Sequence, residues 1–107
     1  MLLDFLRKND INKGIEAFKE TKGAVLLDVR TKGEYLEGHI PGSINIDVGE
    51  IGKADLYIEN KAAPVYVYCY SGSRSGMAVT ALKKMGYTNV RNIGGISAYT
   101  GSIQKGA

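Results

Sequence analysis

Four short runs of residues have the composition of β-strands, and segments with helical features separate them. The runs cover residues 24–29, 43–47, 65–68 and 89–93. They are rich in the apolar, β-branched and aromatic residues that are typical of buried strands. Because strands that alternate with helices favour an α/β fold, we predict an open parallel β-sheet of about five strands with helices on both faces.

Helical segments are predicted between these runs. The first begins at Asn12, which has the side chain of an N-cap residue, and ends near residues 22–23. The residues of this helix expected to face inward are Ile15, Ala17 and Phe18. Residues 32–37 are expected to form a short helix or turn, and residues 49–57 a weak helical stretch.

The longest predicted helix follows the third strand. Its apolar residues recur at the spacing of one helical stripe, at Met77, Ala78, Ala81, Leu82 and Met85. Gly86 stands where a glycine commonly ends a helix. A further short helix is expected after Gly94-Gly95.

A length of 107 residues suits one domain, and 44% hydrophobic residues can supply one core. We expect a single domain over residues 1–107, with a core at about 12–102 and frayed ends at 1–10 and 102–107. Residues 1–8 carry charges too early to form a signal peptide or a membrane span. We therefore expect a cytoplasmic protein that does not bind membranes.

Cys69, the only cysteine, lies where the third strand meets the longest helix. The carboxyl edge of a parallel sheet is where α/β folds place their ligands, and a helix start presents N–H groups with positive partial charge. Because a thiolate is an anion, this position is expected to lower the pKa of Cys69 from its reference of about 8.5. We predict that Cys69 is a catalytic nucleophile. The alternative role of a free cysteine is that of a small buried hydrophobe.

The residues after Cys69 are suited to binding an anion. Gly72 can adopt a positive φ, which lets successive N–H groups turn inward, and Arg74 adds a permanent cation. We predict that the substrate-binding residues are Tyr70, Ser71, Gly72, Ser73, Arg74 and Ser75. Tyr70 is expected either to cover the sulfur or to cap the core. A loop of this kind could bind either a phosphoryl group or a sulfur species.

The spacing Cys-x4-Arg resembles the active-site loop of rhodanese (sulfurtransferase) domains. The similar loop of cysteine phosphatases is one residue longer. Further segments that are similar to rhodanese signatures are residues 26–30, 34–35, 38–46, Gly94-Gly95 and Tyr99. Many relatives carry tryptophan in place of Tyr99. The resemblance runs from about residue 12 to residue 102.

The resemblance implies a rhodanese-like fold and a thiosulfate sulfurtransferase activity that needs no cofactor. In this interpretation the Cys69 thiolate attacks the outer sulfur of thiosulfate, and sulfite leaves. A thiophile such as cyanide or a thiol then takes the sulfur from the Cys69 persulfide. The N–H groups of the loop would stabilise the anionic sulfur, and Arg74 would hold the donor.

Two other functions fit the same loop. The domain could be a sulfur carrier or docking module whose persulfide is loaded and unloaded by partner proteins, with slow turnover of thiosulfate. Phosphatase or arsenate reductase chemistry is the other possibility, and the length of the loop disfavours it.

Three polar residues outside the loop are further candidates. Asp28 and Arg30 lie where the first strand ends, so they could touch the substrate. Hydrogen bonds that fix the turn, together with an ion pair to Glu34, are the favoured interpretation. A lone histidine beside a turn, such as His39, is usually a hydrogen-bonded scaffold residue, and a role as a base for Cys69 is the alternative.

The net charge of +3 is mild, and the basic residues are spread along the chain. Nucleic-acid binding would call for a clustered basic patch or a stacking motif, so we expect none. One cysteine and one histidine give no cluster of metal-ligand spacing, so we expect no metal. The expected partners are a small anionic sulfur donor such as thiosulfate, which the positive charge favours, and a thiol or protein acceptor.

Overall fold

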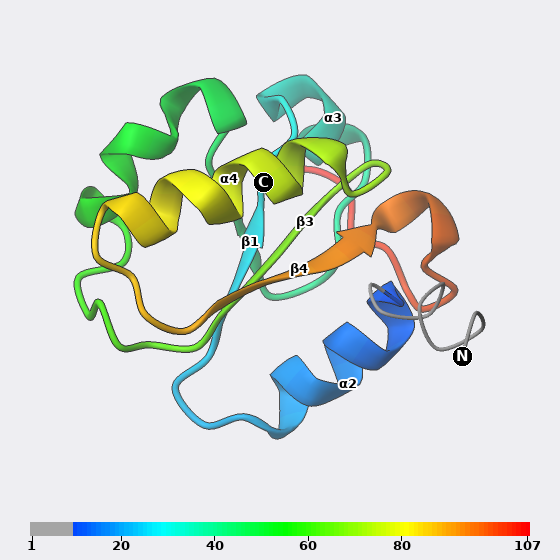
Figure 1. Cartoon of the computed structure of the whole chain (residues 1–107). Helices are drawn as coiled ribbons and strands as arrows, with labels where there is room; N and C mark the ends of the chain where they lie inside the picture. The colour runs from blue at the N-terminus through cyan, green and yellow to red at the C-terminus, as the bar shows by residue number, and fades with distance from the viewer. Residues whose placement is uncertain (1–9) are drawn as a thin grey trace.

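The computed structural model describes residues 10–107, and these form one parallel four-stranded sheet in the order β2-β1-β3-β4 (Figure 1). The strands are β1 (Val25–Asp28), β2 (Ser43–Asn45), β3 (Val65–Cys69) and β4 (Val90–Gly95). Each of the four predicted runs forms one strand, so the α/β fold is confirmed. The sheet has four strands in the described residues instead of about five, because the segments between the runs are helices and turns.

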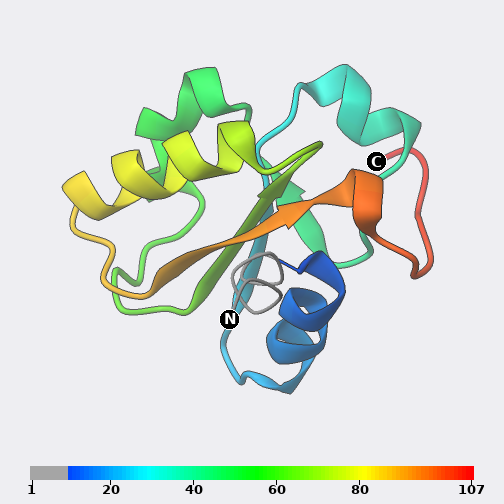
Figure 2. The ribbon, with the colours of Figure 1, turned by 45° about the vertical axis from the view of Figure 1, so that its right-hand side comes forward.

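Helices cover both faces of the sheet, as predicted. They are α2 (Ile11–Glu20), α3 (Lys32–Glu37) and α4 (Ser73–Lys84), with 3₁₀ segments η1 (Val48–Leu56) and η2 (Ile96–Ala98). Figure 2 shows α2 on one face and α4 with η1 on the opposite face. None of the helices in residues 10–107 combines the length and the apolar character that a membrane span requires.

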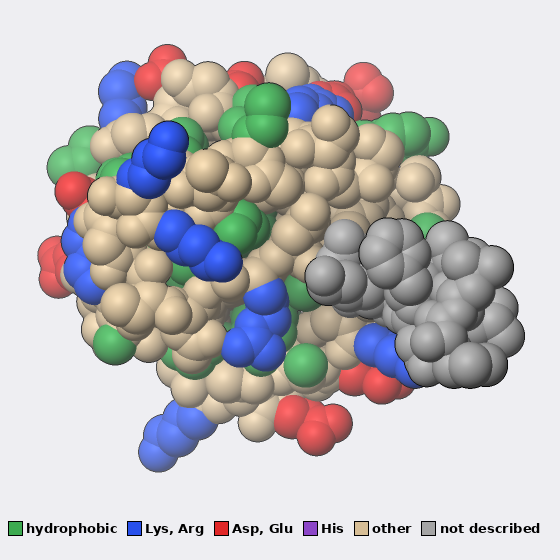
Figure 3. All heavy atoms as spheres, viewed as in Figure 1, with side chains coloured by type: hydrophobic (Ala, Val, Ile, Leu, Met, Phe, Trp, Pro, Cys, Tyr) green, Lys and Arg blue, Asp and Glu red, His purple; other side chains and the backbone are tan. Residues whose placement is uncertain are grey.

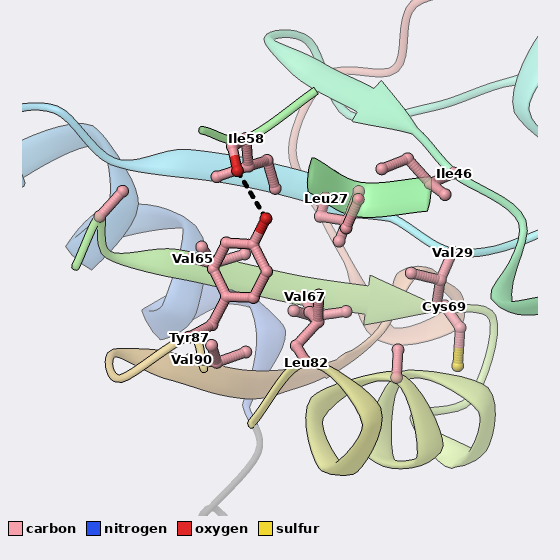
Figure 4. Packing of buried hydrophobic residues seen from close by; sticks show 13 residues of the cluster. Leu27, Val29, Ile46, Ile58, Val65, Val67, Cys69, Leu82, Tyr87 and Val90 are labelled. Carbon is pink, nitrogen blue, oxygen red and sulfur yellow. Dashed lines mark hydrogen bonds between the residues drawn. The ribbon is translucent and has the colours of Figure 1, made fainter. Parts of the chain in front are cut away.

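β3 is buried along its whole length, because strands flank both of its edges and helices cover both of its faces. Its side chains alternate between two apolar clusters. Val65, Val67 and Cys69 belong to the cluster that includes residues of α4 and η1 (Figure 4). Tyr66 and Tyr68 belong to the cluster on the α2 side. A strand that is covered on both faces needs a continuous apolar run, and β3 has one.

Asp10 rather than Asn12 caps α2, which corrects the predicted start of this helix. The Asp10 carboxylate accepts a hydrogen bond from the Asn12 N–H at 3.0 Å and so satisfies a group of the first turn. The side chain of Asn12 instead joins the helix to the Ala98 carbonyl and the Thr100 N–H. The residues predicted to face inward do pack against the α2 cluster: Ile15, Ala17 and Phe18.

α4 begins at Ser73, so its first turn takes up residues that were predicted to belong to the loop. Ala78 and Leu82 are buried as predicted, whereas Met77 is 58% exposed. Met77 precedes Ala78 by one residue, which turns its side chain about 100° away from the buried stripe. Gly86 follows the helix with a φ of 103°, as its predicted role requires.

The C-terminal segment, which was predicted to fray, is tied to the domain. Gln104 exchanges two backbone hydrogen bonds with His39, each at 2.8 Å. The Gly106 N–H donates to the Leu36 carbonyl at 2.8 Å. These bonds attach residues 104 and 106 to the domain, although the C-terminal end was expected to fray from residue 102. Of residues 1–10, also expected to fray, only Asp10 is described, and it caps α2.

Gly95, at the end of β4, lies directly against the chain that follows β3. A Cβ atom at this position would overlap the backbone of Tyr70 and Ser71. Gly95→Ala is therefore expected to lower the free energy of unfolding by about 2–3 kcal/mol, as overpacking against rigid backbone does. Urea denaturation followed by circular dichroism measures this change.

Gly33→Ala is the matched control, because an added Cβ at this exposed helical position would meet nothing within 4 Å. We expect it to leave the free energy of unfolding unchanged or to raise it by up to about 1 kcal/mol. Equal stability of the Gly95→Ala variant and the wild type would contradict the close packing of β4 against the loop.

Candidate active site

The Cys69 thiol lies at the carboxyl end of β3 and points toward the start of α4 (Figure 4). Its residue is 0% exposed. The sulfur accepts hydrogen bonds from the Gly72 N–H at 3.0 Å and from the Ser75 hydroxyl at 3.4 Å. Gly72 is the N-cap of α4 and adopts a φ of 101°, as expected, which aims its N–H back at the sulfur. The thiol is thus buried among hydrogen-bond donors.

The surroundings of Cys69 favour the thiolate. Burial alone raises the pKa of the thiol, because a charged group loses its hydration. The Ser75 hydroxyl and the N–H groups of Ser75, Gly72 and Ser71 donate toward the sulfur and outweigh that effect. The pKa of Cys69 therefore lies below its ordinary value, which favours the thiolate, the form in which a cysteine acts as a nucleophile.

Asn92 of β4 holds the loop in place, although the sequence analysis did not single it out. Its amide group donates to the Gly72 carbonyl at 2.9 Å. Its side-chain oxygen accepts from the Ser75 hydroxyl at 2.7 Å and from the Gly94 N–H at 3.0 Å. The single Ser75 proton thus has two acceptors, Asn92 at 2.7 Å and the sulfur at 3.4 Å. The sequence did contain a signal for this role, because Asn92 is an amide residue in a predicted strand, two residues before the Gly94-Gly95 pair.

The Gly94-Gly95 pair forms the back wall of the loop. Gly94 adopts a φ of 106°, and the register of β3 against β4 shifts beside it. A Cβ on Gly72 would lie 3.4 Å from the Gly94 Cα, so the two backbones approach closely. The Ser97 N–H donates to the Tyr70 carbonyl at 3.1 Å, which fixes the start of the loop to η2.

Arg74 is paired with Glu34 of α3. The guanidinium donates two hydrogen bonds to the carboxylate, at 2.7 and 3.0 Å. These bonds lower the pKa of Glu34 to about 2, and Glu34 in turn raises the pKa of Arg74. The predicted cation is therefore present at the loop, but a carboxylate balances its charge.

The expected ion pair between Arg30 and Glu34 is wrong, because Arg30 pairs with Asp28 at 2.6 Å. Asp28 is 0% exposed and also accepts a hydrogen bond from the Arg30 N–H at 2.9 Å. The guanidinium of Arg30 reaches the Gly38 carbonyl at 2.7 Å. Arg30 is only two residues from Asp28, so their ion pair closes the turn. Glu34 is therefore available to pair with Arg74.

The side chain of His39 contacts its own segment. The ring stacks on Tyr35 with centroids 3.7 Å apart, and Nδ1 lies 2.8 Å from the Tyr35 carbonyl oxygen. Its backbone pairs with Gln104. None of these contacts involves Cys69, so the geometry offers no support for the alternative of a base.

The remaining predicted loop residues lie on the surface around the buried thiol. Ser71 and Ser73 are exposed, and Tyr70 is 55% exposed, so it does not cap the core. Beside Tyr70 is a shallow hollow of about 320 Å³, whose other lining residues are Arg30, Glu34, Glu37 and Gly38. Within residues 10–107, no group of three His, Cys, Asp or Glu residues could hold a metal ion.

A buried thiol with a lowered pKa, at the carboxyl edge of a parallel sheet and at a helix start, is typical of α/β domains in which a cysteine can act as a nucleophile. Comparison with known proteins identifies the family of this domain. The model of the "Rhodanese-like domain" family matches residues 12–102. The chain belongs to the rhodanese family of sulfurtransferases, which confirms the resemblance of its motifs.

Individual relatives agree with this assignment. The chain is 39% identical to "Thiosulfate sulfurtransferase PspE" of Escherichia coli over 71 residues, which cover 65% of this chain and 68% of that protein. It is 37% identical to "Putative sulfur carrier protein YrkF" of Bacillus subtilis over 95 residues, 84% of this chain and 51% of that one. The chain thus spans about half of the Bacillus protein.

Among solved structures, "rhodanese with anions from E. coli" matches with a TM-score of 0.72 and 36% identity. The match covers 78% of this chain and 99% of that one. The SSP1007 protein of Staphylococcus saprophyticus matches with a TM-score of 0.75 and 26% identity, over 89% of this chain and 95% of that one. Both matches support the parallel α/β fold.

Ser75→Ala is expected to raise the pKa of Cys69, because the Ser75 hydroxyl makes the strongest of the contributions that lower it. The thiolate would then form only at higher pH. The rate of alkylation by iodoacetamide, followed by mass spectrometry across a pH series, reports this shift directly.

Thr80→Ala is the control, because Thr80 is an exposed hydroxyl residue of the same helix that bonds to the Gly76 carbonyl. Its alkylation profile should match that of the wild type. An unchanged profile in Ser75→Ala would show that the Asn92 oxygen retains the Ser75 proton in the thiolate state.

Proposed function

We propose that this protein is a thiosulfate sulfurtransferase that moves a sulfane sulfur to a thiophilic acceptor through a Cys69 persulfide. The proposal rests on the environment of the Cys69 thiol. This thiol is buried, it accepts hydrogen bonds from Gly72 and Ser75, and its pKa is lowered. The similarity to PspE, a protein named as a thiosulfate sulfurtransferase, supports the choice of donor.

In the first step the Cys69 thiolate attacks the outer sulfur of thiosulfate. A bond forms between the two sulfur atoms, the sulfur–sulfur bond of thiosulfate breaks, and sulfite leaves with its electron pair. The terminal sulfur of the Cys69 persulfide carries a negative charge. The N–H groups that face the thiol, with the Ser75 hydroxyl, would stabilise this charge because they already point at the sulfur site.

In the second step a nucleophile such as cyanide attacks the terminal sulfur. Thiocyanate forms, and the sulfur–sulfur bond breaks to return the Cys69 thiolate. The two steps balance in atoms and electrons without an external oxidant or reductant, so the proposed reaction requires no cofactor.

The donor must reach a sulfur that is closed off from solvent. Because Cys69 is 0% exposed, its loop has to open enough to admit one sulfur atom. We propose that the residues around this opening bind the donor: Tyr70, Ser71, Gly72, Ser73, Arg74 and Ser75. Tyr70, Ser71 and Ser73 are exposed at the surface and can contact a donor before it enters.

The direct test is the formation of thiocyanate from thiosulfate and cyanide. We expect turnover by the wild type and none by Cys69→Ser, because a hydroxyl cannot form the persulfide. Mass spectrometry of the wild type after thiosulfate alone should show the added mass of one sulfur. Equal turnover by Cys69→Ser would disprove the mechanism.

Single replacements in the pair of Arg74 and Glu34 are expected to have opposite effects on an anionic donor. Arg74→Gln leaves the Glu34 carboxylate unpaired beside the loop and should lower kcat/KM for thiosulfate about tenfold or more. Glu34→Gln leaves Arg74 unbalanced and should raise kcat/KM about threefold. Glutamine can keep the capping box with Thr31, so that only the charge changes.

Two donors of different charge separate this electrostatic effect from a structural one. The changes in kcat/KM that the two variants cause should be larger for thiosulfate, which carries two negative charges, than for methanethiosulfonate, which carries one. Glu20→Gln, at the end of α2, is the control and should leave both donors unaffected. A fall in kcat/KM for both donors in both variants would mean that the pair only holds the loop in shape.

A second candidate function is that of a carrier whose persulfide is loaded and unloaded by protein partners. The balanced charge of Arg74 and the closed loop favour it, because both disfavour a small dianion. The similarity to a protein named as a sulfur carrier supports it as well. No thiocyanate from folded protein, together with Cys69-dependent transfer from a persulfide-bearing protein, would establish this function.

We propose a reducing compartment such as the cytoplasm as the place of action, since Cys69 must remain a free thiol between turnovers. The proposed partners are thiosulfate or a similar anionic donor and a thiol or protein acceptor.

A further inference from the structure

The outer edge of β4 is a second candidate binding surface, separate from the Cys69 site. β4 is the last strand of the sheet, and within residues 10–107 it pairs only with β3. Figure 1 shows this edge between α4 above and α2 below. A free strand edge presents backbone N–H and C=O groups that can pair with another extended chain.

The direction of these backbone groups follows from the pairing with β3. The Val65 N–H donates to the Asn89 carbonyl at 2.8 Å, so the groups of Asn89 face β3. Successive residues of a strand direct their backbone groups to opposite sides. The N–H and C=O groups of Val90 and Asn92 therefore point outward, away from the sheet.

A groove runs along this edge. Its volume is about 540 Å³, and residues of α2, β4 and α4 line it. Three cations lie in its walls, with Lys13 on α2, Lys83 on α4 and Arg91 on β4. Figure 3 shows Lys and Arg side chains gathered on this face, over α4 and β4. Among the described residues, Asp10 is the one acidic residue that lines the groove, and its carboxylate already accepts the Asn12 N–H to cap α2.

The cations of the groove are available to a partner. Within residues 10–107, none of the ion pairs involves Lys13, Lys83 or Arg91. Arg91 is held at the rim, because its guanidinium lies 5.0 Å from the centre of the Tyr66 ring and donates to the Asn89 side chain at 2.8 Å. A held cation loses little conformational entropy when it binds an anionic group.

We propose that this groove binds an extended acidic segment of a partner protein, which adds to β4 as a fifth strand. The outward backbone groups of Val90 and Asn92 would pair with the main chain of the segment. Lys13, Lys83 and Arg91 would contact its carboxylates. Main-chain pairing supplies the affinity in this mode of recognition, and the side chains supply the preference for acidic residues.

A second copy of this chain does not suit the groove. In a symmetric dimer the same surface meets itself, so the edge of each copy would face that of the other. The two sets of Lys13, Lys83 and Arg91 would then share one interface in which, among the described lining residues, only the Asp10 carboxylate of each copy is acidic. Their mutual repulsion disfavours such a dimer and favours an occupant of opposite charge.

The groove ends close to the catalytic loop. Asn92 lines the groove, and its side chain donates to the Gly72 carbonyl beside Cys69. A segment bound along β4 would therefore bring its protein next to the loop. The proposal does not depend on sulfur transfer, because the groove contains none of residues 69–75.

Binding can be measured with a fluorescein-labelled decapeptide of alternating glutamate and valine, by fluorescence anisotropy on the full chain. We expect it to bind more tightly than matched peptides in which glutamine or lysine replaces glutamate. The same acidic peptide with N-methyl groups on alternate residues should bind at least tenfold more weakly, because it cannot pair with a strand edge. In amide exchange by NMR, Val90 and Asn92 should become protected when the acidic peptide binds.

Two neighbouring lysines of α4 provide matched variants. Lys83→Glu should weaken binding of the acidic peptide about five- to tenfold, because it replaces attraction by repulsion in the groove. Lys84→Glu makes the same change of charge one residue away, at an exposed position that does not line the groove, and should change binding less than twofold. Cys69→Ser should bind the peptide as the wild type does, whatever its activity.

Three outcomes would overturn the proposal. Equal binding of the acidic and glutamine peptides would mean that the cations do not select the occupant. Equal effects of Lys83→Glu and Lys84→Glu would place the binding elsewhere. A dimer in sedimentation analysis that protects Val90 and Asn92 without any peptide would identify a second copy of the chain as the occupant.

Discussion

The burial of the Cys69 sulfur among hydrogen-bond donors, which favours its ionised form, is the constraint on which the rest of the site depends. An ionised group loses its hydration inside a protein, and this cost is large unless hydrogen bonds replace the lost water. The Gly72 N–H and the Ser75 hydroxyl supply such bonds to Cys69. They can do so only if the chain turns sharply from β3 into α4, which the positive φ of Gly72 allows. The loop must also lie flat on β4, and Gly95 leaves the room for it.

The charges around the site are organised as two separate pairs with different roles. Arg30 and Asp28 are both buried, and they fix the turn after β1 together with the Gly38 carbonyl. Arg74 and Glu34 are about one-third exposed, so water screens their attraction and the pair adds little to stability. Because this pair lies beside the loop, it affects the electrostatic potential at the loop more than it affects the stability of the fold. In the proposed reaction, the balance between these two side chains would therefore affect whether a dianion or a protein-bound persulfide is the better donor.

The elements that could be predicted from the sequence are those that local chemistry determines. The apolar run before Cys69, Gly72 in the turn and Gly86 after α4 each have a recognisable local requirement. The features that were missed depend on the meeting of distant segments. Asn92 holds the loop only because β4 pairs with β3, and the partner of Arg74 comes from a helix 40 residues earlier in the chain. Met77 was assigned to the core because it is apolar, yet one position along a helix decides which face a side chain occupies.

The sheet offers two edges of different kinds, and their chemistry suits them to different tasks. At the carboxyl edge the backbone donors converge on one point, which suits a reaction at a single sulfur atom. Along the side of β4 the backbone groups recur at regular spacing, which suits recognition of a chain. Asn92 belongs to both regions, since its backbone lies in the free edge and its side chain holds the Gly72 carbonyl. An occupant of the proposed groove that shifted Asn92 would also move the loop over Cys69, so the binding of a partner there would change access to the sulfur through this residue.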